Sequence, residues 1–205
     1  SYFELAKKHR ELKQNDLARQ EIAQGKKILE EALRDYPDTD ERAHANYLLA
    51  NLAMEYAEEL QSPEDKKQRY LEAISRFSEL VSSYADSPYA PKSQFKKALA
   101  FEKLGQLDQA CEEYVKLSYR YPDNELVAET IARLGQYFMS KGKEWQDKAT
   151  AETDFVKKEK ARLQMVDMFK SAAQVFGRLS VRFPDHQMAN KTLVLSATCW
   201  IRAAD

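Results

Sequence analysis

The chain has 205 residues, of which 43% are hydrophobic and 32% are charged, and its formal net charge is −1. This apolar content excludes a disordered chain, and the interspersed, nearly balanced charges provide no basic surface for nucleic acid. Five glycines and six prolines are too few for the many tight turns of an all-β fold. The frequent Ala, Leu, Glu, Lys, Arg and Gln favour helices. We therefore expect an all-α protein.

Apolar residues at helical spacing predict about nine helices. The first two are either separate or one helix bent at Asn15-Asp16. No segment of about 18 apolar residues is present, so we expect no membrane span. No linker rich in Gly, Ser or Pro divides the chain, so we expect a single domain over residues 1–205, itself part of a longer protein. The helices are expected over about residues 2–14, 16–35, 40–61, 64–84, 88–104, 107–121, 125–141, 154–183 and 187–204.

Four helical segments end in a similar triplet. The triplets are Tyr36-Pro37-Asp38, Tyr84-Ala85-Asp86, Tyr121-Pro122-Asp123 and Phe183-Pro184-Asp185. Proline cannot continue a helix, and an aspartate at this place can cap the next one. An apolar ladder with steps of four, three and four residues precedes three of the triplets. Thirteen residues after the middle residue of each triplet stands a small residue, and three positions further stands Ala53, Phe101, Phe138 or Trp200. The small residues are Ala50, Ala98, Gly135 and Ala197.

This pattern resembles the tetratricopeptide repeat. The resemblance covers nearly the whole chain and implies a right-handed α-solenoid of helical hairpins. The regular step of 37 residues from Ala98 to Gly135 and the aromatic-Pro-Asp ending are similar in style to bacterial envelope members of the family. These include the outer-membrane lipoprotein of β-barrel assembly and the Tol–Pal coordinator protein, so the comparison favours the periplasm or cell envelope. The clearest copy is Ala98, Phe101, Gly105, Ala110, Tyr114, Leu117 and Pro122.

The repeats are unequal in length. The step from Ala50 to Ala98 is 48 residues, and the step from Gly135 to Ala197 is 62. Because the triplets on either side are intact, the additional residues must lie inside two hairpins, within 54–72 and 139–171. They should lengthen both helices of each hairpin or enlarge the turn. Trp145, near the tip of the larger extension, either contacts a partner or folds back as a cap on its own hairpin.

Residues that could support chemistry are scattered. Three histidines lie in different repeats, and Cys111 and Cys199 have no neighbouring ligands, so we predict neither a metal site nor a disulfide framework. No phosphate-binding loop or nucleophile motif is present. We therefore predict a protein that is not an enzyme, needs no cofactor and binds another protein or peptide.

Members of the resembled family bind partners on a concave face lined by the first helix of each hairpin. The resemblance thus implies a scaffold or adaptor that uses this face or the extended hairpins. The alternative is a helical accessory domain of a larger cell-envelope enzyme whose catalytic domain lies outside this chain. Phe95 and Leu99 could instead pack against a neighbouring helix. The expected lining is His44, Tyr47, Asn51, Met54, Glu55, Lys92, Phe95, Leu99, Glu102, Lys103, Glu129, Ala132, Gln136, Met139, Lys191, Val194 and Thr198.

The last predicted helix is unusually apolar between Thr192 and Ile201. A terminal repeat of a solenoid normally presents a polar outer face. We therefore expect either that the natural chain continues after Asp205 or that this helix associates with a second copy.

Overall fold

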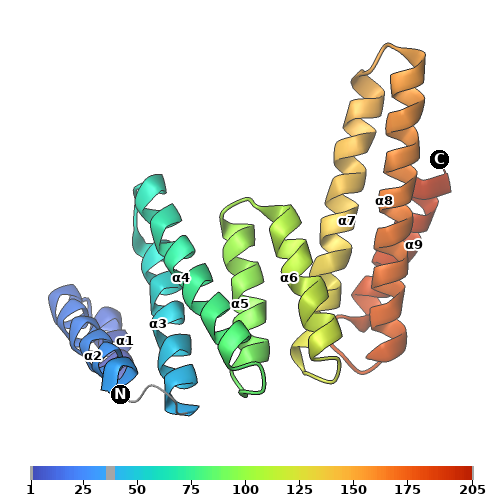
Figure 1. The fold of residues 1–205 in the computed structure, drawn as a ribbon. Coiled ribbons are helices and arrows are strands. Elements are labelled where there is room, and N and C mark those ends of the chain that lie inside the picture. The colour runs from blue at the N-terminus through green and yellow to red at the C-terminus, as the bar shows by residue number, and fades with distance from the viewer. Residues whose placement is uncertain (1, 36–39, 205) are drawn as a thin grey trace. The chain divides into compact units, whose positions relative to one another are not determined.

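The computed structural model describes residues 2–35 and 40–204, and within these ranges the regular structure consists of nine α-helices and no strand (Figure 1). The predicted all-α class is therefore confirmed. The break between the first two helices falls at Lys13, whose φ is 59°. The helices are α1 (Tyr2–Glu11), α2 (Asn15–Asp35), α3 (Asp40–Glu59), α4 (Pro63–Ser83), α5 (Ala90–Lys103), α6 (Leu107–Arg120), α7 (Leu126–Ala151), α8 (Phe155–Arg182) and α9 (Ala189–Ala204).

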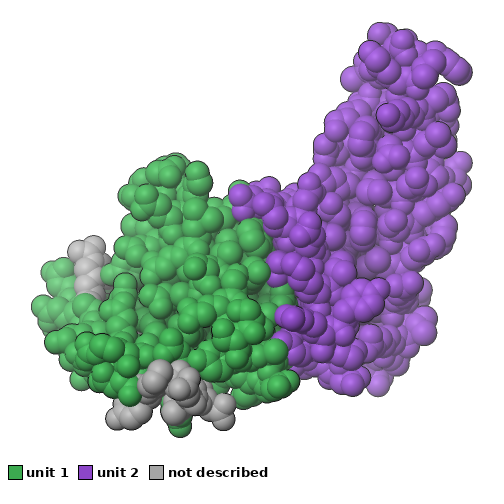
Figure 2. Space-filling model, in the orientation of Figure 1, with its two compact units in different colours: residues 1–104 green, residues 105–205 purple. Residues whose placement is uncertain are grey.

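The helices are grouped into two compact units, residues 1–104 and residues 105–205 (Figure 2). In the first unit each helix from α1 to α5 packs against the next, and α3 also contacts α5. In the second unit α7 packs against both α6 and α8, and α8 packs against α9. Helices that pack in chain order form the successive hairpins of an α-solenoid. The units meet in sequence at Gly105, whose φ of 72° suits a residue without a side chain.

The predicted closing triplets form the same turn three times. Tyr84, Tyr121 and Phe183 end α4, α6 and α8 with φ values of −133°, −129° and −130°. Each donates its backbone N–H to the leucine carbonyl four residues earlier. Its own carbonyl accepts the N–H of the residue three positions later at 3.0 Å in all three turns. This repeated geometry confirms that the triplets mark equivalent positions.

The expectation that the aspartates of these triplets cap the next helix is wrong at α5 and α7, neither of which has a side-chain bond at its N-cap. The residue after the aspartate makes the local bond instead, because the turn places its side chain beside the N–H two positions later. The corresponding Asp38 lies outside the described residues. The acceptors and donors are Ser87 Oγ with Tyr89 N, Asn124 Oδ1 with Leu126 N, and His186 Nδ1 with Met188 N.

Small residues bring paired helices close together, as the sequence predicts. In the first unit Ala50 and Ala53 of α3 pack against Ala73 and Phe77 of α4. In the second unit the ring of Phe176 in α8 lies directly against the backbone of Gly135 in α7. A Cβ atom built on that glycine would be 2.4 Å from Phe176 Cε1.

Both predicted insertions lengthen helices. The α3–α4 helices have 20 and 21 residues and the α7–α8 helices have 26 and 28, whereas α5 and α6 have 14 each. The helix expected to end near residue 141 continues to Ala151. Gly142 lies in this added stretch and is buried, and a Cβ there would be 2.9 Å from Phe169 Cδ1. Phe169 of α8 therefore covers the glycine, and their packing supports the longer helix. The α7–α8 hairpin extends beyond α6 and α9 (Figure 1).

Candidate functional site

The first unit carries an aromatic platform, formed by His44, Tyr47 and Tyr89. The rings of His44 and Tyr89 are stacked, with centroids 4.6 Å apart and planes 5° apart. Tyr47 approaches Tyr89 at 5.4 Å and also meets the buried ring of Phe77 at 6.2 Å. His44 is exposed, and the two tyrosines are half-buried. The platform therefore offers aromatic surface on a support fixed by the core.

Tyr89 was not among the residues expected from the sequence. It lies in the turn before α5, and its backbone N–H is held by Ser87 Oγ at 3.3 Å. This turn carries the ring to α3. The only sequence signal is the position of Tyr89 five residues after Tyr84, which ends α4.

The other expected residues of α3 and α5 have different surroundings. Asn51 donates its side-chain N–H to the carbonyl of Tyr47 at 2.8 Å, so part of its hydrogen-bonding capacity is used within α3. Met54 packs against two core clusters of the first unit. Phe95 is only 6% exposed, so it is part of the core and does not line an open face. Leu99 is half-buried. Glu102 is half-buried, and the exposed residues are Glu55, Lys92 and Lys103.

Lys103 takes part in a polar cluster with Glu58 and Tyr70. Lys103 Nζ is 2.6 Å from Glu58 Oε1, and the Tyr70 hydroxyl donates to the same oxygen at 2.8 Å. The hydrogen bonds from Lys103 and Tyr70 lower the pKa of Glu58. Burial, together with the bond to Glu58, raises the pKa of Tyr70 to about 12. The cluster links α3, α4 and α5.

In the second unit, three expected residues of α7 lie together. Glu129, Ala132 and Gln136 line a pocket of about 290 Å³. Arg133 binds Glu129 Oε1 through Nε at 3.2 Å and Nη2 at 3.0 Å. The sequence did not indicate the other lining residues, three of which lie in the turn before α9. They are Arg133, His186, Gln187 and Met188.

The remaining expected residues of the second unit do not line this pocket. Met139 is half-buried and packs against the cluster around Phe169. Lys191 and Val194 are exposed on α9. Thr198 is half-buried and donates its hydroxyl to the Val194 carbonyl at 2.9 Å. Two of the three α9 residues thus retain accessible side chains.

Trp145 lies six residues before the end of α7. It is half-buried and packs against the cluster that contains Phe169 and Met165. Lys148 Nζ lies 4.3 Å from the centroid of its ring. Trp145 and Lys148 also line a pocket with Lys157 and Lys160. The ring therefore packs within its own hairpin and also lines a pocket that contains three lysines.

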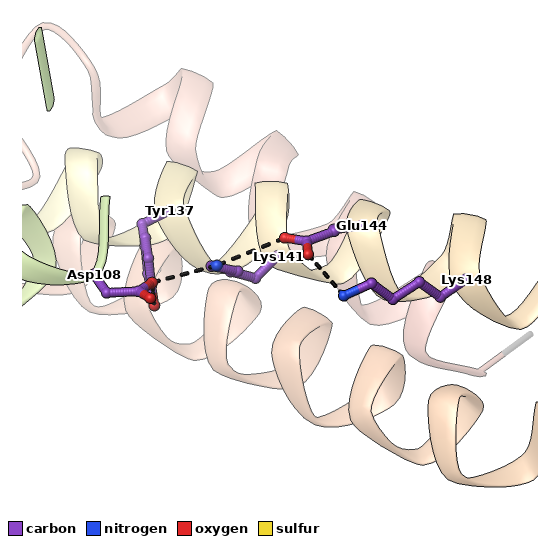
Figure 3. Close-up of polar contacts among 5 residues, drawn as sticks. All are labelled: Asp108, Tyr137, Lys141, Glu144 and Lys148. Atoms are coloured by element: carbon purple, nitrogen blue, oxygen red, sulfur yellow. Dashed lines mark hydrogen bonds and ion pairs between the residues drawn. The ribbon is translucent and has the colours of Figure 1, made fainter. Parts of the chain in front are cut away.

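A chain of polar contacts joins α6 to the extended part of α7 (Figure 3). The Tyr137 hydroxyl donates to Asp108 Oδ1 at 2.8 Å, and Lys141 Nζ is 3.3 Å from the same oxygen. Glu144 then lies between Lys141, at 3.6 Å, and Lys148, at 2.8 Å. The bond from Tyr137, with Lys141 beside it, lowers the pKa of Asp108. Burial and Asp108 raise the pKa of Tyr137. These contacts join α6 to α7.

The thiols have little thiolate character at neutral pH. Burial, with smaller contributions from Asp108 and Glu112, raises the pKa of Cys111 to about 11. Burial also raises the pKa of Cys199. Among the described residues, no group of three His, Cys, Asp or Glu side chains is arranged to hold a metal ion. None of the helices in the described ranges is long and apolar enough to cross a membrane.

Comparison with known proteins gives a match to a family model. The model of the YfiO family, described as outer membrane lipoprotein, matches residues 11–123, which is more than half of the chain. This range includes the aromatic platform and the first closing triplets. A search of curated proteins gives no match.

Proposed function

We propose that this chain, which belongs to the YfiO family of outer membrane lipoproteins, is a non-catalytic scaffold of the bacterial cell envelope that binds a segment of another protein. The family match supports the envelope location and a role in protein–protein interaction. The resemblance to tetratricopeptide repeats supports binding on the first helix of each hairpin. We further propose that residues 1–205 act as a single binding domain.

The observation that supports this proposal most strongly is the aromatic platform of the first unit. Aromatic side chains with exposed faces provide much of the binding energy at protein interfaces, because they bury a large area at low entropic cost. His44 and Tyr47 project from α3, and Tyr89 is held beside them by its stacking with His44 at 4.6 Å. This preorganised surface favours an apolar or aromatic anchor residue on the partner.

The pocket on α7 supports a polar contribution to the same function. Gln136 is exposed, and Glu129 and Arg133 form an ion pair with an Nη2–Oε1 distance of 3.0 Å. Such a pocket has donors and acceptors for the backbone or polar side chains of a bound segment. We propose that this pocket binds a polar part of the same partner protein.

Site-specific photocrosslinking in cells of the native host tests the proposal. A photoreactive amino acid is introduced at His44 or Gln136, and at Gln68 of α4 or Gln109 of α6 as exposed controls on the second helices of hairpins. We expect the same crosslinked partner from the first two positions and none from the controls. Tyr47→Ala should reduce the yield at His44. Equal crosslinking at all four positions, or none at His44 and Gln136, would contradict the proposed face.

A further inference from the structure

A groove separate from the proposed face lies between α6, α7 and α8. It has a volume of about 680 Å³. Tyr119 of α6 is 82% exposed and Val181 of α8 is 85% exposed, and both line the groove. These are the two most exposed large hydrophobic side chains among the described residues. Exposed apolar side chains that gather in one concave place are typical of an interaction site.

The floor of the groove is apolar and rigid. Ile131 and Leu134 of α7 line it and are 9% and 6% exposed, so they are fixed by the core beneath. Val175 of α8 adds to the same wall. An apolar side chain inserted between Tyr119 and Val181 would therefore rest on a preformed surface and lose its contact with water.

The charged side chains that line the groove are all basic. Its charged lining residues are Arg178 and Arg182 of α8, and the lining contains no carboxylate. Arg182 Nη2 donates to the Pro122 carbonyl at 2.7 Å, which holds this side chain at the rim. Arg178 is exposed and has no ion-pair partner among the described residues. An occupant with carboxylates beside its apolar face would complement both arginines.

The walls of the groove favour a helical occupant. They are helices, whose backbone N–H and C=O groups bond within the same helix. An extended segment would bury backbone groups with no partners on these walls, and this is unfavourable. A helix satisfies its own backbone and presents apolar side chains three and four residues apart. From Gln174 to Arg182 the α8 wall spans about two turns, or ~12 Å.

We propose that this groove binds an acidic amphipathic α-helix of a partner protein. Large apolar side chains of that helix pack between Tyr119 and Val181, and its flanking carboxylates bind Arg178 and Arg182. The groove uses residues of α6 and α8 that do not belong to the proposed partner-binding face. The two proposals can therefore fail independently.

The test uses the whole chain and a fluorescein-labelled, end-capped helical peptide of roughly 18 residues. The peptide has Leu and Phe on one face and Glu beside them, and fluorescence anisotropy measures its affinity. We expect Val181→Asp to weaken binding at least about tenfold, because it puts a charge into the apolar contact. Val156→Asp is the matched control: this valine is 74% exposed on α8 and lies outside the groove. It should leave the affinity unchanged.

A charge exchange tests the second half of the proposal. Arg178→Glu should weaken the Glu peptide and strengthen a peptide in which every Glu is replaced by Lys. Lys158→Glu, at an exposed position of α8 outside the groove, should do neither. A peptide with its Leu and Phe replaced by Ala should not bind. The proposal is overturned if the parent protein fails to bind the Glu peptide, binds the Lys peptide equally well, or binds the Glu peptide unchanged after Val181→Asp.

Discussion

Substitutions at helical glycines of the second unit test how closely α7 packs on α8. Replacing a helical glycine by alanine normally stabilises a protein by about 1 kcal/mol, because alanine loses less backbone entropy. At Gly135 the added Cβ would lie 2.4, 2.6 and 2.8 Å from three ring atoms of Phe176. Ordinary carbon contacts are about 3.5–4.0 Å, so the ring would have to move by about 1 Å.

Phe176 is fully buried, with 0% exposure, so its ring has no free space to enter. Overpacking costs about 1–3 kcal/mol, and because the ring has no free space we expect about 2–3 kcal/mol here, more than the gain of about 1 kcal/mol in helix propensity. We expect Gly135→Ala to lower the free energy of unfolding by about 1–2 kcal/mol. Gly177→Ala is the matched control. Its Cβ would meet only Ser196 Oγ at 3.5 Å, so we expect it to stabilise by about 0.5–1 kcal/mol.

Urea unfolding followed by tryptophan fluorescence is suited to this measurement. The chain has two tryptophans, Trp145 and Trp200, and both lie in the second unit. Their signal therefore reports the unit that contains both glycines. In a double-mutant cycle, Phe176→Leu should reduce the cost of Gly135→Ala because it removes ring atoms from the clash. The packing argument is refuted if Gly135→Ala is as stable as the parent protein, or if Gly177→Ala is the more destabilising change.

Three further predictions concern charge, reactivity and association. Bonds from Lys103 and Tyr70 lower the pKa of Glu58 below its ordinary 4.5. The stability that ionised Glu58 contributes is therefore complete above pH 4.5 and is lost as the pH falls through its folded-state pKa. In an acid titration followed by circular dichroism, Glu58→Gln should therefore lose less stability below pH 4.5 than the parent protein. The pKa of about 11 at Cys111 predicts roughly hundredfold slower alkylation at pH 8 than in the urea-unfolded chain, and equal rates measured with a thiol reagent would contradict it. Ile201 is 64% exposed on α9. If this helix associates with a second copy, Ile201→Glu should convert the dimer to a monomer in sedimentation experiments. A parent protein that sediments as a monomer at all concentrations would exclude this association.

The sequence predicted those features that depend on local chemistry. Apolar spacing located the helices, and the aromatic endings at Tyr84, Tyr121 and Phe183 formed equivalent turns because each follows the same ladder of buried residues. The end of α7 was missed because Gly142 weakens a helix locally, whereas its packing against Phe169 depends on a residue far along the chain. Tertiary contacts override local propensity in such places.

The candidate site was less predictable than the fold. Spacing places His44 and Tyr47 on one face of α3, but it does not reveal that Tyr89 stacks on His44, because that contact depends on the path of a turn. Spacing also cannot decide which apolar residue of α5 faces the core. Phe95 is buried there, whereas Leu99 retains partial exposure.

The length of the α7–α8 hairpin has a consequence for the evolution of this protein. Around the turn that joins them, α7 and α8 extend past α6 and α9, and there each has mainly the other to pack against (Figure 1). Matched insertions or deletions of about two turns in both helices would leave the register of the remaining repeats intact, since each repeat contacts only adjacent elements. Natural variation can therefore change the length of the α7–α8 hairpin without altering the packing of the other repeats.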